Sequence, residues 1–431
     1  MTVILTGRTG IVAAVGALLV LAAGPLAGEI VDGVLVVAVM VDVVLAASPR
    51  AVRVHRAGDR QCRAGESATV DVVLRNVGRR RLRATVRDAW PPSAAPTGER
   101  HRVDVAPGEQ RRLRTALRPT RRGERSADRV TVRSVGPSGL AGRQRSHVAP
   151  WSVQVLPAFS SRRYLPERLA RLRQLDGLVA APLRGQGSEF DSLREYVLGD
   201  DVRAIDWRAT ARHGDVVVRT YRPERDRRVV VVLDTGRTSA ARVGDAPRLD
   251  AAIEAALLLA ALARRAGDRV DLLAYDTQVR AAVRSRGADG GLAGFVQALA
   301  PLQPRLVETD AEGLVAEVLR RSPRRALVVL FTGMEPAALE AGLLPVLPQL
   351  GRSHVLILAA ASDPRMSELA RGRGDAAAVY AAAAAQRELA RRQRISALLH
   401  RHGARVVSAG PEELAPAVAD AYLALKAAGR L

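Results

Sequence analysis

The chain has 431 residues, which is enough for two or three domains, and its 66 basic residues outnumber 44 acidic ones to give a net charge of +22. Lys426 is the only lysine, so the other 65 basic residues are arginines. A hydrophobic fraction of 48% excludes a disordered chain. The single cysteine, Cys62, excludes an intrachain disulfide and a multi-cysteine metal cage, and it fits a reducing compartment.

Two apolar runs open the chain, over residues 11–27 and 30–47. Each is near the lower limit of about 17–25 residues for a membrane-spanning helix. Gly24-Pro25 and Gly28-Glu29 are helix breakers and predict a tight turn between the runs. We therefore expect residues 1–49 to form a transmembrane helical hairpin.

A signal peptide is the alternative, with Arg8 before the apolar stretch 11–23. The second apolar run favours the hairpin, because a signal peptide alone does not require it. Arginines lie at both outer ends of the pair: Arg8 before it, and Arg50, Arg53 and Arg56 after it. The positive-inside rule then predicts a multi-pass protein of the cell membrane with the bulk of the chain in the cytoplasm.

Asp42 is the unusual residue of the second run. A carboxylate at the centre of a span costs about 2.5–3.5 kcal/mol, and less near an end. In an antiparallel hairpin Asp42 and Arg8 fall in the same leaflet. A local ion pair or an interfacial carboxylate is the favoured interpretation, and a polar contact to a partner's helix is the alternative.

Residues 50–157 alternate in polarity with a period of two, which is typical of strands. Turn signals separate the expected strands, which include residues 67–74, 82–88, 102–105, 111–117, 129–135 and 151–156. Some seven short strands predict an all-β, immunoglobulin-like sandwich. Its arginines are expected on the outward face, and nothing in it suggests catalysis.

Residues 158–228 carry a dense mixture of charges around two of the chain's few aromatic residues, Tyr196 and Trp207. A nucleic-acid surface would be of one sign. The nearly balanced charge from Glu189 to Arg212 instead favours an ion-pair network or a protein-docking surface.

The run from Gly199 to Gly214, GDDVRAIDWRATARHG, resembles the signature of the bacterial domain-of-unknown-function 58 family. The matching residues are Arg194, Tyr196, Gly199, Asp200, Asp201, Arg203, Ile205, Asp206, Trp207, Arg208, Thr210, Ala211 and Arg212. Two shorter elements of the β domain, Arg121-Arg122-Gly123 and residues 136–140, also resemble elements of that family.

The resemblance implies a membrane hairpin, a β domain, the signature segment and a von Willebrand factor A-like domain, in that order. Family members have no settled biochemical activity. They are often encoded beside AAA+ ATPases of the MoxR type and are thought to act as membrane-anchored assembly or interaction factors.

Residues 229–431 alternate between apolar strands and helices, which independently predicts a doubly wound, mostly parallel α/β sheet. Strands are expected at 228–234, 269–275, 326–331, 354–360 and 404–407. Helices are expected at 249–265, 311–320, 336–350, 384–402 and 412–428. Ligands of such sheets bind at the carboxyl ends of the strands, near a switch point.

Asp234-Thr-Gly-Arg-Thr238 follows the first of these strands and resembles the Asp-x-Ser-x-Ser metal loop of von Willebrand A domains. The resemblance assigns Asp234, Thr238 and the later Thr309 as ligands of a divalent cation such as Mg²⁺. Gly236 replaces a serine, and Thr332-Gly333 stands where a second aspartate is expected. With these two ligands lost, we expect no tightly held cofactor and at most Mg²⁺ at a degenerate site. A loop merely closed by Asp234 and Thr238 is the alternative.

Within the signature, Asp206 and Arg203 adjoin Ile205 and Trp207, so we expect them to be partly buried and structural. Arg194 and Arg212 lie further from the apolar residues and are expected at an exposed docking surface. No nucleophile elbow or metal motif is present, so we do not expect an enzyme.

The favoured function is a membrane-anchored protein-interaction or assembly factor that works with an AAA+ ATPase. The alternatives are an arginine-rich binder of anionic lipid or nucleic acid, and an unrecognised enzyme that uses the carboxylates of the signature. Protein partners and the membrane are expected; nucleic acid and a small-molecule substrate are not.

Overall fold

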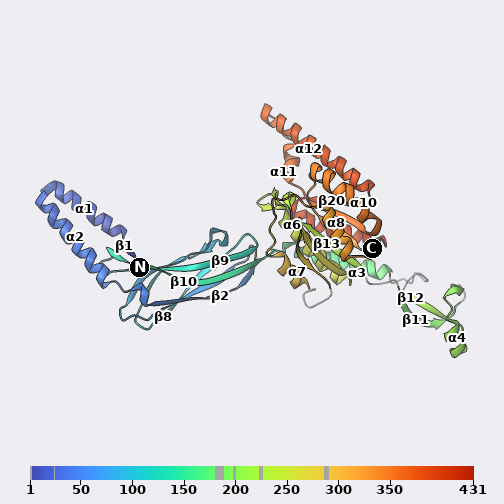
Figure 1. Cartoon of the computed structure of the whole chain (residues 1–431), viewed down its shortest axis with the longest axis horizontal. Coiled ribbons are helices and arrows are strands. Elements are labelled where there is room, and N and C mark those ends of the chain that lie inside the picture. Colours follow the sequence, from blue (N-terminus) through green and yellow to red (C-terminus); the bar gives the residue numbers. More distant parts are fainter. Residues whose placement is uncertain (1, 24, 180–188, 198–199, 223–226, 286–290) are drawn as a thin grey trace. The chain divides into compact units, whose positions relative to one another are not determined.

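The computed structural model describes residues 2–23, 25–179, 189–197, 200–222, 227–285 and 291–431, and it divides into two compact units, Met1–Ala158 and Phe159–Leu431 (Figure 1). Each unit has its own sheets and its own apolar core.

Two consecutive helices lie near the start of the first unit, α1 (Gly7–Ala23) and α2 (Pro25–Leu45). They pack closely: a Cβ on Gly16 would lie 2.6 Å from a Val31 methyl carbon. Gly24 lies outside the described residues, and Gly28-Glu29, expected in the turn, lies inside α2. That detail of the prediction is wrong because a helix tolerates an isolated glycine at a modest cost.

The remainder of the first unit is a β-sandwich. One sheet has the order β1-β10-β9-β5-β7 with β3 beside β10, and the other has the order β2-β4-β8-β6. The strands are β1 (Thr2–Leu5), β2 (Val52–Gly58), β3 (Gln61–Arg63), β4 (Ala68–Asn76), β5 (Leu82–Asp88), β6 (Pro96–Thr97), β7 (Arg100–Val105), β8 (Gln110–Leu117), β9 (Gly123–Val135) and β10 (Ala141–Leu156). Alternate residues of both sheets, such as Val72 and Val132, are fully buried between them. The sandwich prediction is confirmed, although β1 was not expected.

Arg56 is an exception to the expected outward arginines. It lies on β2 in the core, where its Nη2 is 2.6 Å from Asp88 Oδ1 and both side chains are fully buried. Trp90 donates to the other carboxylate oxygen at 2.8 Å, so every member of this ionic cluster has a partner. The expectation was wrong because alternation places Arg56 on the same inward face as Val52.

The second unit contains a sheet of the order β17-β16-β13-β18-β19-β20, which is parallel except for the edge strand β17. Its strands are β13 (Arg228–Asp234), β16 (Arg269–Tyr275), β17 (Val279–Val283), β18 (Leu327–Phe331), β19 (Val355–Ala361) and β20 (Ala404–Ala409). This is a doubly wound order whose switch point lies between β13 and β18. The strand predictions are confirmed to within two or three residues, but β17 was not predicted.

Helices cover both faces of this sheet, which explains why β13 is a continuous apolar run. Helices α6 (Arg248–Arg265) and α13 (Pro411–Ala427) pack together on one face. On the other face, helices α8, α10 and α12 share a core with Val230 and Leu330. The remaining helices of this part are α5 (Arg237–Ala240), α7 (Leu292–Leu299), α8 (Ala311–Arg321), α9 (Pro336–Ala338), α10 (Leu344–Ser353), α11 (Pro364–Leu369) and α12 (Ala376–Arg401).

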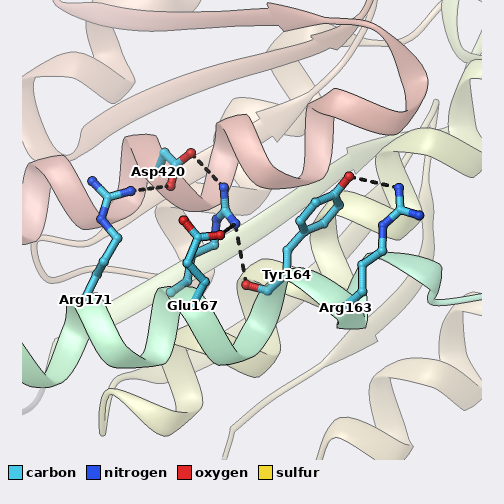
Figure 2. A network of polar contacts seen from close by, with 6 residues as sticks. Arg163, Tyr164, Glu167, Arg171 and Asp420 are labelled. Atoms are coloured by element: carbon cyan, nitrogen blue, oxygen red, sulfur yellow. Dashed lines mark hydrogen bonds and ion pairs between the residues drawn. The ribbon is translucent and has the colours of Figure 1, made fainter.

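Helix α3 (Leu165–Val179) is fixed to α13 by the ionic network in Figure 2. Arg168 is almost fully buried and donates to Asp420 at 2.9 Å, and Arg171 donates to the other oxygen of Asp420 at 3.2 Å. The short helix before α3 is held by Glu254 of α6, which accepts hydrogen bonds from the Phe159 N–H and the Ser160 hydroxyl at 2.9 and 3.0 Å. The start of the second unit is therefore held by several ionic contacts.

The signature forms a small module with its own two-stranded sheet, β11 (Glu189–Glu195) and β12 (Val217–Arg222). Helix α4 (Trp207–His213) lies between these strands in sequence, and it ends at Gly214, whose φ of 85° requires the left-handed conformation.

Candidate functional site

Asp234 lies at the carboxyl end of β13, beside the switch point of the sheet, and its side chain is the centre of a junction between three loops. Its Oδ1 accepts hydrogen bonds from the Gly236 N–H at 2.8 Å and the Thr309 hydroxyl at 2.5 Å. Its Oδ2 accepts from the hydroxyls of Thr238 at 2.9 Å and Thr332 at 2.6 Å. The residue is only 4% exposed, so these four donors provide the solvation that water would give.

This junction brings together all three residues predicted from the metal loop, Asp234, Thr238 and Thr309. It adds Thr332, which the sequence places at the position of the missing aspartate. A hydroxyl there donates to Asp234, whereas a carboxylate would repel it. Thr332 could have been recognised as a replacement donor only with the distances in hand.

The donor set does not fit a tightly held divalent cation. It offers one carboxylate, whose oxygens already accept four hydrogen bonds, and three hydroxyls, whereas a protein site that holds a divalent cation tightly relies on carboxylate charge. A Cβ on Gly236 would lie 2.1 Å from Thr309 Oγ1. The loop is therefore packed too tightly to admit the serine that the metal loop has at this position. Nearby Glu308 and Glu335 are paired with Arg237 and Arg248 respectively. Among the described residues, no group of three or more His, Cys, Asp or Glu residues could hold a metal ion.

Two hollows lie in the second unit. The first, next to Asp234, has a volume of about 50 Å³ and is lined by Thr309, Thr332 and leucines of neighbouring helices. The second, about 330 Å³, lies at the start of α6 and α13 beside Glu254 and Glu412. Ligand pockets usually measure about 300–1,000 Å³, so the first is too small for an organic ligand. In the larger hollow, the Glu254 carboxylate already accepts hydrogen bonds from Phe159 and Ser160 at the start of the second unit.

The signature module is built around two aspartates that fix its turns. Asp206 caps α4 by accepting from the N–H groups of Arg208 and Ala209 at 3.0 and 3.1 Å. Arg219 of β12 donates to its other oxygen at 2.8 Å, and this hydrogen bond lowers the pKa of Asp206. The prediction that Asp206 is partly buried and structural agrees with this geometry, since its side chain is 13% exposed.

Asp200 performs the same task in the preceding turn. It accepts from the Val197 N–H at 2.9 Å and from Arg194 Nη2 at 2.6 Å. This bond raises the pKa of Arg194 and ties the side chain to the module. Arg194 is therefore ion-paired within the module while its side chain stays 36% exposed, and its expected place at a docking surface stays a prediction.

The remaining signature residues lie at or near the surface. Asp201 caps a short 3₁₀ helix by accepting from the Arg203 N–H at 3.0 Å. Arg203 is exposed, which contradicts the expected burial, and Arg212 is exposed as expected. Tyr196 is half-buried, and its N–H bonds to the Val216 carbonyl at 2.7 Å. Gly199 lies outside the described residues.

The module also exposes large apolar side chains. Trp207 is 69% exposed at the first position of α4, and Val202 and Val197 are 63% and 53% exposed. We call these three residues the Trp207 patch. The sequence located Trp207 but predicted it as apolar support for the charged residues, and it gave no signal that this rare aromatic would be exposed.

A second carboxylate junction lies at Asp42 of α2, a residue that the sequence marked as unusual without indicating its partners. Its Oδ1 accepts from the Ser138 N–H at 3.0 Å, and its Oδ2 accepts from the N–H groups of Leu140 and Ala141 at 2.6 and 3.0 Å. The Thr6 hydroxyl donates to the carbonyl of Gly139 in the same turn at 2.6 Å. Asp42 is thus neither paired with Arg8 nor directed at a partner's helix.

The turn at residues 136–141 is shaped to receive that carboxylate. A Cβ on Gly136 would lie 2.4 Å from Asp42 Cγ, so only glycine fits. Arg8 donates to the Ser138 carbonyl of the same turn at 3.4 Å. The glycine-rich element at 136–140, which the sequence marked as a family resemblance, therefore joins the apolar helices to the sandwich.

These features define a class: a chain with an apolar N-terminal helix long enough to cross a membrane, a β-sandwich, and an α/β unit whose polar centres are hydrogen-bonded junctions. Residues 192–405 match the family model described as "Protein of unknown function DUF58", and the chain belongs to this family. No curated protein matches the sequence.

Solved structures similar to parts of the chain include the CARDB domain of a Pyrococcus furiosus protein in complex with di-metal ions. It is 16% identical, covers 24% of this chain and 91% of its own, and has a TM-score of 0.17. A FixG-related protein from Vibrio parahaemolyticus is 10% identical over 24% of this chain and 96% of its own, with a TM-score of 0.19. A GH20 exo-β-N-acetylglucosaminidase from Vibrio harveyi is 9% identical over 83% of this chain and 75% of its own, with a TM-score of 0.22. These scores are too low to carry an argument about function.

Proposed function

We propose that this protein is a membrane-anchored protein-interaction or assembly factor that works with a MoxR-type AAA+ ATPase and has no catalysis of its own. The Trp207 patch carries the proposal. An exposed tryptophan and two exposed valines on one small module, which Asp200 and Asp206 hold together, are typical of a surface that is buried by a protein partner.

The anchor in this proposal is a transmembrane hairpin made of α1 and α2. The second apolar stretch, Gly28–Ala51, has 24 residues and a mean hydropathy of 2.5, which is sufficient to cross a bilayer. The first, Gly7–Leu21, is shorter. Exposed apolar side chains follow both helices, including Ile11, Leu18, Val34 and Met40, and lipid would cover them.

The α/β unit is proposed to be a von Willebrand A-like adaptor. The strand order with an antiparallel edge strand supports this, as does the position of the Asp234 junction at the switch point. The ATPase partner rests on the family resemblance alone. The absence of catalysis is proposed because the signature aspartates are engaged by backbone N–H groups and arginines.

Photo-crosslinking in native membranes tests the proposal. A photoreactive phenylalanine analogue replaces Trp207 in one variant and Tyr380 in a control variant; Tyr380 is 79% exposed on α12. We expect a discrete protein adduct from position 207 only, with a AAA+ ATPase among the proteins that mass spectrometry identifies. Equal adducts at both positions, or none at 207, would refute the docking role of the Trp207 patch.

Topology is tested separately by fusing alkaline phosphatase after Leu431. The proposed hairpin keeps the fusion in the cytoplasm, where the phosphatase stays inactive. High phosphatase activity would instead support the signal-peptide alternative.

A further inference from the structure

We propose that the junction between the apolar helices and the β-sandwich is a docking surface for anionic phospholipid headgroups. The surface consists of Arg8, Arg50, Arg79 and Arg80, which we call the arginine collar. The inference rests on the anchoring part of the proposed function and adds the class of lipid that the anchor selects.

The four residues come from three segments that meet at one end of the helix pair. Arg8 is the second residue of α1 and contacts the Ser138 carbonyl, in the turn that also holds Asp42 of α2. Arg50 belongs to the short 3₁₀ helix that follows α2. Arg79 and Arg80 lie in the turn between β4 and β5, and Arg80 Nη1 donates to the Val44 carbonyl at 2.5 Å.

A backbone contact fixes that last turn to the end of the apolar stretch. The Val77 N–H donates to the Ala51 carbonyl at 2.9 Å, and a Cβ on Gly78 would touch the Ala51 methyl group at 3.0 Å. The exposed apolar surface of α2 extends as far as Val44 and Leu45, which are 58% and 46% exposed. The collar therefore begins where the lipid-compatible surface ends, which is the level of the headgroups in a bilayer that α2 crosses.

The charge of the collar is not neutralised by the protein. All four arginines are exposed, and among the described residues no carboxylate forms an ion pair with any of them. The acid of this junction, Asp42, is 1% exposed and its oxygens accept hydrogen bonds from three backbone N–H groups. The next arginine along the chain, Arg81, contrasts with the collar because it is paired with Asp104 at 2.6 Å.

Anionic phospholipid is the occupant that fits this chemistry. Guanidinium groups bind phosphate through paired N–H donors, and basic clusters beside a membrane span attract anionic headgroups. Zwitterionic lipid offers the same phosphate together with a cation that the collar would repel. We therefore expect selection for phosphatidylglycerol over phosphatidylcholine.

The test uses the full chain in nanodiscs made of equal parts phosphatidylglycerol and phosphatidylcholine. After detergent extraction, native mass spectrometry measures which lipid stays bound. Wild type should retain phosphatidylglycerol preferentially, and Arg50→Gln with Arg80→Gln should lose about fivefold of that preference per arginine. The control, Arg102→Gln with Arg129→Gln, removes two exposed arginines from the middle of β7 and β9 and should keep the preference. Thermal melting of both double variants checks that the sandwich is intact.

Incorporation of the wild type without a lipid preference would overturn the inference and leave the proposed anchor standing. An equal loss in the control would also overturn it, because net charge rather than the collar would then be responsible. Failure of the wild type to enter nanodiscs would overturn the anchor and the collar together.

Discussion

Asp42 and Asp234 are buried carboxylates that join distant segments, one in each unit, but they are satisfied by different donors. Asp42 binds three backbone N–H groups of a turn some hundred residues away in sequence. Asp234 binds one backbone N–H and three threonine hydroxyls. A backbone N–H in a fixed turn cannot reorient when its acceptor is removed, whereas a hydroxyl can rotate toward water or another acceptor.

The difference suggests which junction tolerates change. At Asp42 the charge is stabilised mainly by backbone N–H groups, with a further hydrogen bond from the Ser138 side chain, so the turn depends chiefly on glycine for access. At Asp234 the donors are specific side chains, because three of the four hydrogen bonds come from threonine hydroxyls. Substitutions at Asp42 and Asp234 therefore measure how much the free energy of unfolding depends on backbone donors and on side-chain donors, respectively.

The largest effect is expected for Asp42→Ala. It leaves three buried N–H groups without an acceptor, and since bonds to charged acceptors contribute about 1.5–3 kcal/mol each, we expect the sandwich to lose at least about 3 kcal/mol. Melting of the detergent-solubilised chain, followed by the fluorescence of buried Trp90, measures it. Asp42→Asn keeps one acceptor and should lie between alanine and wild type. A wild-type melting curve for Asp42→Ala would show that the junction contributes no stability.

Asp234→Ala is expected to cost less, about 2 kcal/mol, because its hydroxyl donors can reorient. Urea unfolding followed by helical circular dichroism reports on the second unit. In wild type, Mg²⁺ should change the melting temperature little, although a bound ligand at a hundredfold excess over Kd would add about 2.7 kcal/mol. A clear rise with Mg²⁺ that disappears in Asp234→Ala would contradict the metal-free account.

Gly236→Ser tests the same loop from the opposite direction, by restoring the serine of the metal loop. Its Cβ would collide with Thr309 Oγ1, so we expect a loss of about 2 kcal/mol, as for overpacked cores, with no recovery in Mg²⁺. Gly236→Ser combined with Thr309→Ala should recover part of the stability, because the second change removes the colliding hydroxyl. If the single variant is as stable as wild type, the loop is not packed around glycine.

A smaller, pH-dependent effect is expected at His354, before β19. It is 5% exposed, neither ring nitrogen has a hydrogen-bond partner among the described residues, and burial lowers its pKa. The unfolded chain therefore binds the proton more readily, so stability present above the unfolded pKa of about 6.5 declines as pH falls, by at most ~1.4 kcal/mol per pH unit. His354→Leu should flatten this part of the urea-unfolding profile between neutral and mildly acidic pH. An unchanged slope would show that other groups titrate there.

Much of the fold was predictable because it depends on local patterns. The apolar run at 229–233 has no polar interruption, so it indicates a strand buried on both faces, and the alternation at 68–74 indicates one face of a sandwich. The alternation of side chains along β2 places Arg56 on the same inward face as Val52, although the charge of Arg56 suggested a solvated position. Strand β17, with the exposed pattern Val279–Val283, gave no comparable signal because an edge strand buries little.

The junctions were predictable only in part, because their partners are distant in sequence. Asp42 was recognisable as unusual, yet nothing local connects it to Ser138. The sequence indicated only that Thr332 replaces an aspartate of the metal loop. In the structure its hydroxyl donates a hydrogen bond to Asp234. Arg194 and Asp200 are only six residues apart, but their pairing depends on a turn whose geometry the charge pattern does not specify.

Asp234 holds the fold, whereas the Trp207 patch is proposed to meet a partner, and one capture experiment compares the two directly. Full chains carrying Trp207→Ala or Asp234→Asn are used to capture partners from solubilised membranes, with the captured protein normalised to folded bait. Trp207→Ala should melt as wild type does and lose capture, whereas Asp234→Asn should melt earlier and keep capture per folded molecule. Full capture by Trp207→Ala, or loss of capture by folded Asp234→Asn, would contradict the account.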